Sequence, residues 1–196
     1  MMRTHKALVA LFVLVALAAC GSSPKSSFYT LSAVETAKQG TSNGSYSIAI
    51  GSVAVPDVID RPQFVTRTGA NELTINEFAR WGEPLRSEIP RVIAADLARD
   101  LDGAFVSIYP QSSGGTADYR LQLDVRRFDS SLGEAATVEV VWTLRPLKGT
   151  AVIGRSVARE ATAGAGYDAL VAAHSRALSS VSRDIAGAVK TMRSKP

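Results

Sequence analysis

The chain has 196 residues, of which 46% are hydrophobic and 20% charged, and its formal net charge is +4. This hydrophobic content excludes a largely disordered chain, and a single cysteine excludes a fold held by internal disulfides. Two histidines and one cysteine also leave few ligands for a transition-metal site. The basic residues form no clustered face of the kind that binds nucleic acid.

The first 19 residues predict a secretion signal that is removed from the working protein. Basic residues including Arg3 and Lys6 precede an unbroken apolar run from Ala7 to Ala19. A membrane-spanning helix needs about 20 apolar residues, and this run is shorter. Small residues then lead into the only cysteine, Cys20, in the order Leu-Ala-Ala-Cys. This order resembles the lipobox of bacterial lipoproteins.

The lipobox predicts that Cys20 carries diacylglyceryl and acyl groups, palmitate among them, and anchors the chain to a membrane. An ordinary signal peptide that leaves a free thiol is the alternative. Gly21 follows the cysteine, where an aspartate would resemble the signal for inner-membrane retention in Gram-negative bacteria. We therefore expect a lipid-anchored protein on the periplasmic face of the outer membrane. Without residues 1–19 the chain keeps 20 basic and 18 acidic residues, so it is nearly neutral.

Residues 20–27 are predicted to form a flexible tether, because "GSSPKSS" has no apolar residue to bury. Seven such residues have a root-mean-square reach of roughly 15 Å. The remaining residues, 28–196, are enough for one domain with a core of its own.

The first half of this domain reads as strands followed by a helix. "FYTL" is a short candidate strand, and "YSIAIGSVAVP" is a longer one whose change of register predicts a bulge at Gly51–Ser52. Residues 63–78 predict two strands around a turn at 69–71. The segment "PLRSEIPRVIAADLARDL" predicts a helix, with Pro90 as a kink or as the start of its regular part. Its apolar stripe comprises Leu85, Ile89, Val92, Ile93, Leu97 and Leu101.

The second half reads as a meander followed by a long helix. "FVSIYP" predicts a strand, and "DYRLQLDVRRF" alternates until a bulge near residues 126–127. "ATVEVVWTLRPL" and "AVIGRSVARE" complete an antiparallel meander. From Tyr167 to about Met192 the apolar residues follow helical spacing. The fold class is therefore α/β in the broad sense (α+β): a single domain with a mixed, largely antiparallel sheet, a mid-chain helix and a long C-terminal amphipathic helix packed on it.

No constellation for catalysis is apparent in the sequence. His174 lies on or beside the buried stripe of the last helix, where we expect a hydrogen-bonded histidine at the edge of the core. No nucleophile elbow or phosphate-binding loop accompanies it. Asp57 and Asp60 form a carboxylate pair in a proline-rich segment. This pair is the only basis in the sequence for an enzymatic function. We expect no catalytic residues, no metal and no cofactor apart from the acyl groups on Cys20.

The segment from Val55 to Leu85 combines arginines, prolines and aromatic residues, which are types enriched at protein interfaces. Its aromatic residues Phe64, Phe78 and Trp81 look exposed. The alternative is that Phe78 and Trp81 cover the start of the first helix.

Four stretches, in their order and spacing, resemble the ABC-transport auxiliary lipoprotein (PqiC-like) family. They are "FYTL", "VPDVIDRPQFVTR", "FARWGEPL" and "DYRLQLDVRRFD". The chain departs from the family pattern at Gly82, where alanine is usual, and at Arg126, where an apolar residue is usual. The resemblance implies a small α/β domain with no known catalytic residues.

The resemblance also implies a function and its partners. Such proteins are accessory lipoproteins of MCE-type lipid transport systems. The lipoprotein contacts an MCE-domain periplasmic protein (PqiB-like), which in turn has an inner-membrane partner. A homo-oligomeric ring is plausible as a collar for the end of the transport tunnel. The residues expected at an interface with a partner or between subunits are Arg61, Pro62, Phe64, Arg67, Trp81, Glu83 and Pro84. A stand-alone periplasmic lipid-binding or stress lipoprotein is the alternative.

Overall fold

The computed structural model describes residues 24–33, 45–108 and 116–194. The predicted signal at 1–19 and the acylation site Cys20 lie outside these ranges, so both stay predictions. The elements, in chain order, are β1 (Ser27–Tyr29), β2 (Tyr46–Ala54), β3 (Gln63–Arg67), β4 (Leu73–Trp81), α2 (Leu85–Asp100), β5 (Ala104–Ile108), β6 (Tyr119–Ser131), β7 (Ala135–Pro146), β8 (Val152–Ala161) and α3 (Tyr167–Ser194).

The larger sheet has five strands in the order β5-β2-β6-β7-β8. The strand β2 lies parallel to both β5 and β6, and β6, β7 and β8 form the predicted antiparallel meander. Both predicted bulges are confirmed: the β2 register shifts between Ile50 and Val53, and the β6 register shifts between Val125 and Arg127. Each bulge restores an apolar residue to the covered face, which is why Phe128 is buried.

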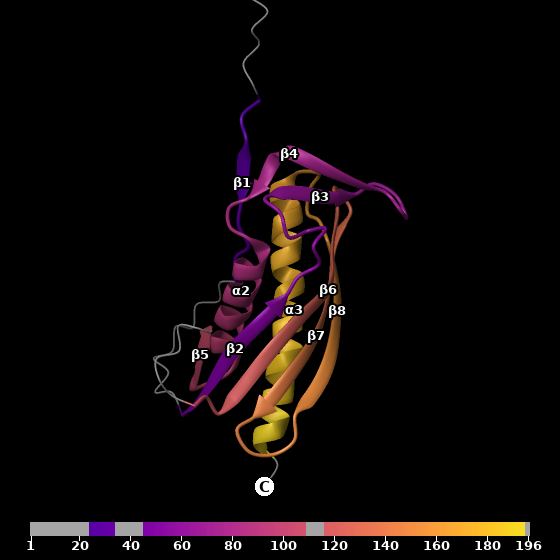
Figure 1. Cartoon of the computed structure of the whole chain (residues 1–196). Coiled ribbons are helices and arrows are strands. Elements are labelled where there is room, and N and C mark those ends of the chain that lie inside the picture. Colours follow the sequence, from indigo (N-terminus) through magenta and orange to yellow (C-terminus); the bar gives the residue numbers. More distant parts are fainter. Residues whose placement is uncertain (1–23, 34–44, 109–115, 195–196) are drawn as a thin grey trace, which may run out of the picture.

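The two helices cover one face of this sheet (Figure 1). The amphipathic α3 packs on β7, β8 and α2, and its buried residues include the predicted Leu170, Leu178, Val181, Ile185 and Val189. The shorter α2 continues through Pro90 and buries the predicted apolar stripe. The predicted α+β domain is confirmed by this architecture.

A second sheet of three strands, in the order β1-β4-β3, crosses the end of the domain that is opposite the C-terminus (Figure 1). The sequence pattern predicts one sheet, and the structure has two. The difference arises at residues 55–62, where the chain leaves β2 through a turn around Pro56 and enters β3 in a new direction. There β3 pairs with β4 in the predicted hairpin, and β1 adds to β4 in parallel.

Aromatic rings join the small sheet to the main core. Phe64 lies between Tyr29 and Tyr167 at its edges and stacks on Trp81, with ring centroids 4.0 Å apart. Trp81 in turn meets Phe128 of the large sheet edge-on. The strands β1, β3 and β4 are therefore held in place by one buried aromatic cluster, and the connections at their ends form the site described next.

Candidate functional site

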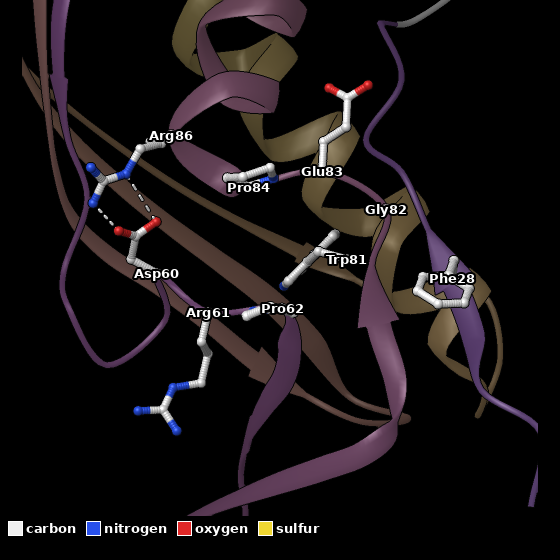
Figure 2. Close-up of a pocket in the computed structure, with 9 residues that line it drawn as sticks. All are labelled: Phe28, Asp60, Arg61, Pro62, Trp81, Gly82, Glu83, Pro84 and Arg86. Carbon is white, nitrogen blue, oxygen red and sulfur yellow. Dashed lines mark hydrogen bonds and ion pairs between the residues drawn. The ribbon is translucent and has the colours of Figure 1, made fainter.

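A groove with a cavity volume of about 470 Å³ lies where three chain segments meet (Figure 2). It is lined by Phe28 of β1, by Asp60, Arg61 and Pro62 before β3, and by Trp81, Gly82, Glu83, Pro84 and Arg86 between β4 and the first turn of α2. This volume lies within the range of known ligand cavities, which is roughly 300–1,000 Å³.

Backbone hydrogen bonds fix the three segments relative to one another. The N–H of Trp81 donates to the carbonyl oxygen of Pro62 at 2.7 Å, and the N–H of Gly82 donates to that of Tyr29 at 2.8 Å. The groove is therefore preformed by main-chain contacts, and its side chains need little rearrangement to meet a partner.

The floor of the groove is a rigid aromatic stack. Trp81 is only 5% exposed because its ring lies on Phe64. Below it, His174 stacks on Phe128, with centroids 3.9 Å apart and planes within 6°. The edge of Trp81 that remains accessible, together with Phe28, Pro62 and Pro84, gives the groove an apolar wall (Figure 2).

Charged side chains form the rim of the groove. Nε and Nη2 of Arg86 donate to the two carboxylate oxygens of Asp60, and this contact raises the pKa of Arg86. On the other side, Glu83 lies 3.4 Å from Arg91. The side chain of Arg61 extends away from the Asp60–Arg86 pair (Figure 2), and its buried Nε has no hydrogen-bond partner among the described residues. Arg61 is thus the rim cation that is left to bind an incoming acceptor.

The structure brings together most of the interface residues expected from the sequence. Arg61, Pro62, Trp81, Glu83 and Pro84 line the groove. Phe64 lies beneath its floor and is fully buried, and Arg67 lies elsewhere, bound to Asp129 of β6. Roles of these residues in an interface stay predictions. In the structure, Phe64 supports Trp81 and Arg67 holds β3 against β6.

Two expectations about exposure need correction. Phe64 and Trp81 look exposed in the sequence, yet both are buried, because β1 pairs beside β4 and α3 closes the space beneath them. Only Phe78 of the three aromatic residues is exposed. Trp81 packs on Phe64, Phe128 and His174, and its edge still lines the groove.

Four groove residues were not predicted at an interface: Phe28, Asp60, Gly82 and Arg86. Phe28 sits in a recognised strand, but nothing local indicates that β1 pairs with β4 across 50 residues. Gly82 has a local reason to be small, because a Cβ there would lie 2.8 Å from Cγ2 of Thr30. The departure from the usual alanine at this position is therefore matched by the side chain of Thr30.

Ion pairing and burial disfavour catalytic roles for the titratable residues near the groove. Asp60 is neutralised by Arg86. His174 is buried at the edge of the core, as predicted, and its Nε2 lies 2.8 Å from Oγ of Ser130. Burial lowers the pKa of His174 to about 3, so the ring is neutral at physiological pH. This serine–histidine pair is closed to any substrate because both residues are buried.

Burial also affects Glu88, in α2 next to the groove. Its carboxylate is fully buried and accepts a hydrogen bond from the N–H of Leu31 at 3.0 Å, with Arg91 at 3.5 Å. Burial raises the pKa of Glu88 despite these contacts. This carboxylate ties the segment after β1 to α2. Among the described residues, no three histidine, cysteine, aspartate or glutamate side chains gather in a metal-binding arrangement.

Solved structures of other proteins share this fold. An uncharacterized protein of known crystal structure superposes with a TM-score of 0.71 and is 21% identical over 85% of this chain and 99% of its own. Protein XCC0632 from Xanthomonas campestris superposes with a TM-score of 0.67 and is 20% identical over 84% of this chain and 94% of its own. At such identities the similarity establishes the fold alone.

The sequence identifies the family. The family described as "ABC-type transport auxiliary lipoprotein component" matches residues 29–186, and the chain belongs to this family. The resemblance noted from the four sequence stretches is thereby confirmed. No protein with a curated description matches the chain. Within the described ranges, neither helix is long and apolar enough to span a bilayer.

Proposed function

We propose that this protein is a non-enzymatic accessory lipoprotein of an MCE-type (Pqi-like) intermembrane lipid transport system. It is anchored through Cys20 to the periplasmic face of the outer membrane and docks the periplasmic transporter there, which supports envelope integrity. The partner is an MCE-domain protein (PqiB-like) that connects to an inner-membrane component. Membership of the auxiliary lipoprotein family supports the transport role and the anchor.

The groove is the observation that carries this proposal. Its walls come from the "FYTL", "DRP" and "RWGEPL" stretches, which are the same stretches that resemble the family. An apolar wall with a tryptophan edge and an unpaired arginine on its rim has the composition of a protein-binding hot spot. Backbone hydrogen bonds preform the groove, which lowers the entropic cost of binding.

The lipid anchor determines where the groove can meet a partner. A tether with a root-mean-square reach of roughly 15 Å keeps the domain near one membrane while leaving it free to tilt. Confinement near a surface raises the effective concentration of the groove toward a partner that arrives from the opposite membrane. Modest affinity at the groove is then sufficient for stable docking.

Affinity capture from detergent-solubilised envelopes tests the proposal. The full-length lipoprotein should retain an MCE-domain protein in near-stoichiometric amount, identified by mass spectrometry. Arg61→Glu should remove most of it, because the substitution reverses the unpaired rim charge. Arg145→Ala, at an exposed arginine on the far end of β7, is the matched control and should capture normally. Loss of capture by both variants, or by neither, argues against the groove as the docking site.

A stand-alone lipid-binding lipoprotein is the second candidate, and the apolar wall of the groove favours it. The cavity volume is sufficient for a small apolar ligand. Native mass spectrometry of the mature domain separates the two functions. The lipid-binding function predicts that phospholipid co-purifies with the domain and is lost from a Phe28→Asp variant. It also predicts that the capture experiment retains no MCE-domain protein. The same spectra report whether the protein forms the ring that a tunnel collar requires.

A further inference from the structure

Residues 63–78 of the β3–β4 hairpin lie at the end of the domain that is opposite the C-terminus (Figure 1). Several of their apolar side chains are exposed to solvent. We call these residues the arm. Leu73, Ile75 and Phe78 are 40%, 44% and 46% exposed, respectively. Three exposed large apolar residues within six positions form a patch that normally marks a contact surface. None of the three lines the groove, so the proposed docking site leaves the arm unexplained.

The arm is held rigidly on the body of the domain. Arg67 near its tip binds both carboxylate oxygens of Asp129 in β6 and donates to the carbonyl oxygen of Ala70. At its base, the side-chain amide of Asn76 donates to the hydroxyl of Tyr167, while its oxygen accepts from the N–H groups of Phe78 and Ala79. The exposed side chains are therefore fixed in space.

Leu73 and Ile75 share one face of the arm. In the β3–β4 register Leu73 lies opposite Arg67 and Ile75 opposite Val65. Residues two apart in a strand point to the same side, so Leu73 and Ile75 form an apolar stretch of this face beside the salt-bridged Arg67, and Glu77, which accepts a hydrogen bond from Gln63, follows at the base. Nearby charges balance: Arg80 lies 3.6 Å from Glu77. A partner for this surface must offer apolar material and does not need a strong opposite charge.

The length of the tether allows the arm to reach the membrane surface. Cys20 and Ser27 are seven positions apart in the sequence, so the acylated cysteine lies at most about 25 Å from the start of β1. Ser27 pairs directly with Ala79, the residue after Phe78. Leu73 lies six residues farther along β4, at most about 20 Å away. Cys20 and Leu73 therefore lie at similar maximum distances from the paired residues Ser27 and Ala79.

We propose that the arm inserts Leu73, Ile75 and Phe78 into the interface of the bilayer that holds the acyl groups of Cys20, and so fixes the tilt of the domain. The proposal rests on the lipid anchor of the proposed function and is independent of the MCE partner. Apolar side chains on a rigid element enter this interfacial layer readily when other groups already hold the protein there. The groove then faces the periplasm in one defined direction.

The test uses the fact that Cys20 is the only native cysteine and is blocked by its acyl group. Ile75→Cys and Phe78→Cys each give the lipoprotein one free thiol for an environment-sensitive fluorophore such as NBD. Ile153→Cys is the matched control, at a 72% exposed apolar residue on β8. The labelled lipoproteins are reconstituted at low density in vesicles of phosphatidylethanolamine and phosphatidylglycerol, which contain no other protein.

We expect both arm labels to emit at shorter wavelength, to resist quenching by iodide several-fold more than the control label, and to be quenched by lipid-borne nitroxides. Emission like that of the control at both arm positions overturns the proposal while leaving docking at the groove intact. A blue shift that disappears when the protein is further diluted in the bilayer means that the arm contacts a second copy of the protein, and this result also overturns the proposal. If the protein does not float with the vesicles, it has no lipid anchor, and both proposals fail because both depend on that anchor.

Discussion

Arg67 of β3 binds both carboxylate oxygens of Asp129 in β6, with Nε and Nη2 each 3.1 Å from its acceptor. This pair connects the three-stranded sheet to the five-stranded sheet at a point where both side chains are largely shielded from solvent. Bidentate arginine–carboxylate contacts impose geometry as well as attraction. The pair therefore sets the angle of the arm relative to the body.

We expect Arg67→Ala to lower the free energy of unfolding by about 1–2 kcal/mol, because a charge-assisted hydrogen-bond pair in a shielded position is lost. Asp129 keeps Arg127 as a partner, which limits the cost. Urea denaturation followed by circular dichroism measures the change. Arg155→Ala removes an exposed contact with Glu139 and should cost less than about 0.5 kcal/mol. Equal costs for the two variants would contradict the structural role of Arg67.

The same pair predicts a loss of stability in acid. Burial tends to raise the pKa of Asp129, but the hydrogen bonds and charges of Arg67 and Arg127 outweigh it and hold the pKa below its usual value. The carboxylate therefore contributes stability at pH values above about 4, and this contribution is lost as the pH falls through the lowered pKa. In Asp129→Asn, the free energy of unfolding should depend less on pH below 4 than in the native protein.

His174 predicts a different pH dependence, at higher pH. Because burial lowers its pKa to about 3, the folded state does not bind the proton that the unfolded state takes up below about pH 6.5. Between pH 7 and pH 5 the protein should lose about 2 kcal/mol through this residue. The raised pKa of Glu88 acts in the opposite direction, so the native protein must be compared with His174→Gln. If both proteins show the same slope of unfolding free energy against pH, His174 is accessible to protons in the folded state.

Gly154 of β8 is predicted to tolerate no side chain. A Cβ there would lie 2.1 Å from Cζ2 of Trp142, whose indole N–H is bonded to Oγ of Ser156. Gly154→Ala should therefore cost about 1–3 kcal/mol, the usual range for overpacking in a core. Gly166→Ala, where nothing lies within 4 Å of the added Cβ, is the control and should change stability little. Thermal unfolding of both variants at pH 7 checks the difference.

The groove residues should separate into structural and binding roles. Trp81→Ala removes a buried, stacked ring and should cost about 3–5 kcal/mol of stability. Arg61→Ala should leave stability within about 0.5 kcal/mol, because no side-chain partner among the described residues is lost. Partner capture is therefore interpretable with Arg61 variants and not with Trp81→Ala. A large destabilisation by Arg61→Ala would make that arginine part of the framework as well.

The sequence was sufficient to predict most individual elements, because local periodicity determines them. The bulges at 50–53 and 125–127 followed from single changes of register within an alternating strand. The stripes of α2 and α3 followed from helical spacing, and their apolar residues are buried as expected. The position of His174 at the covered side of α3 followed from the same spacing.

The pairing between distant strands could not be predicted from these local signals. Nothing in "FYTL" indicates that Tyr29 pairs with Trp81, or that β2 lies parallel to both β5 and β6. The second sheet, the burial of Phe64 and the groove all follow from these pairings. The candidate site was nevertheless predicted in part, because the "DRP" and "RWGEPL" stretches supply seven of its residues, five of which were predicted at an interface, and meet through the hydrogen bond from Trp81 to Pro62.

The position of α3 after all the strands in chain order determines when the domain can fold. This last element supplies thirteen buried residues and closes the core beneath both sheets. Until it emerges, Phe64, Trp81 and Phe128 have no complete apolar environment, and contacts this distant in sequence form slowly. On the proposed lipid anchor, Cys20 is therefore available for acylation before the domain folds. A truncation that removes α3 from Leu178 onward should prevent folding, because Leu178, Val181 and Ile185 are then missing from the core.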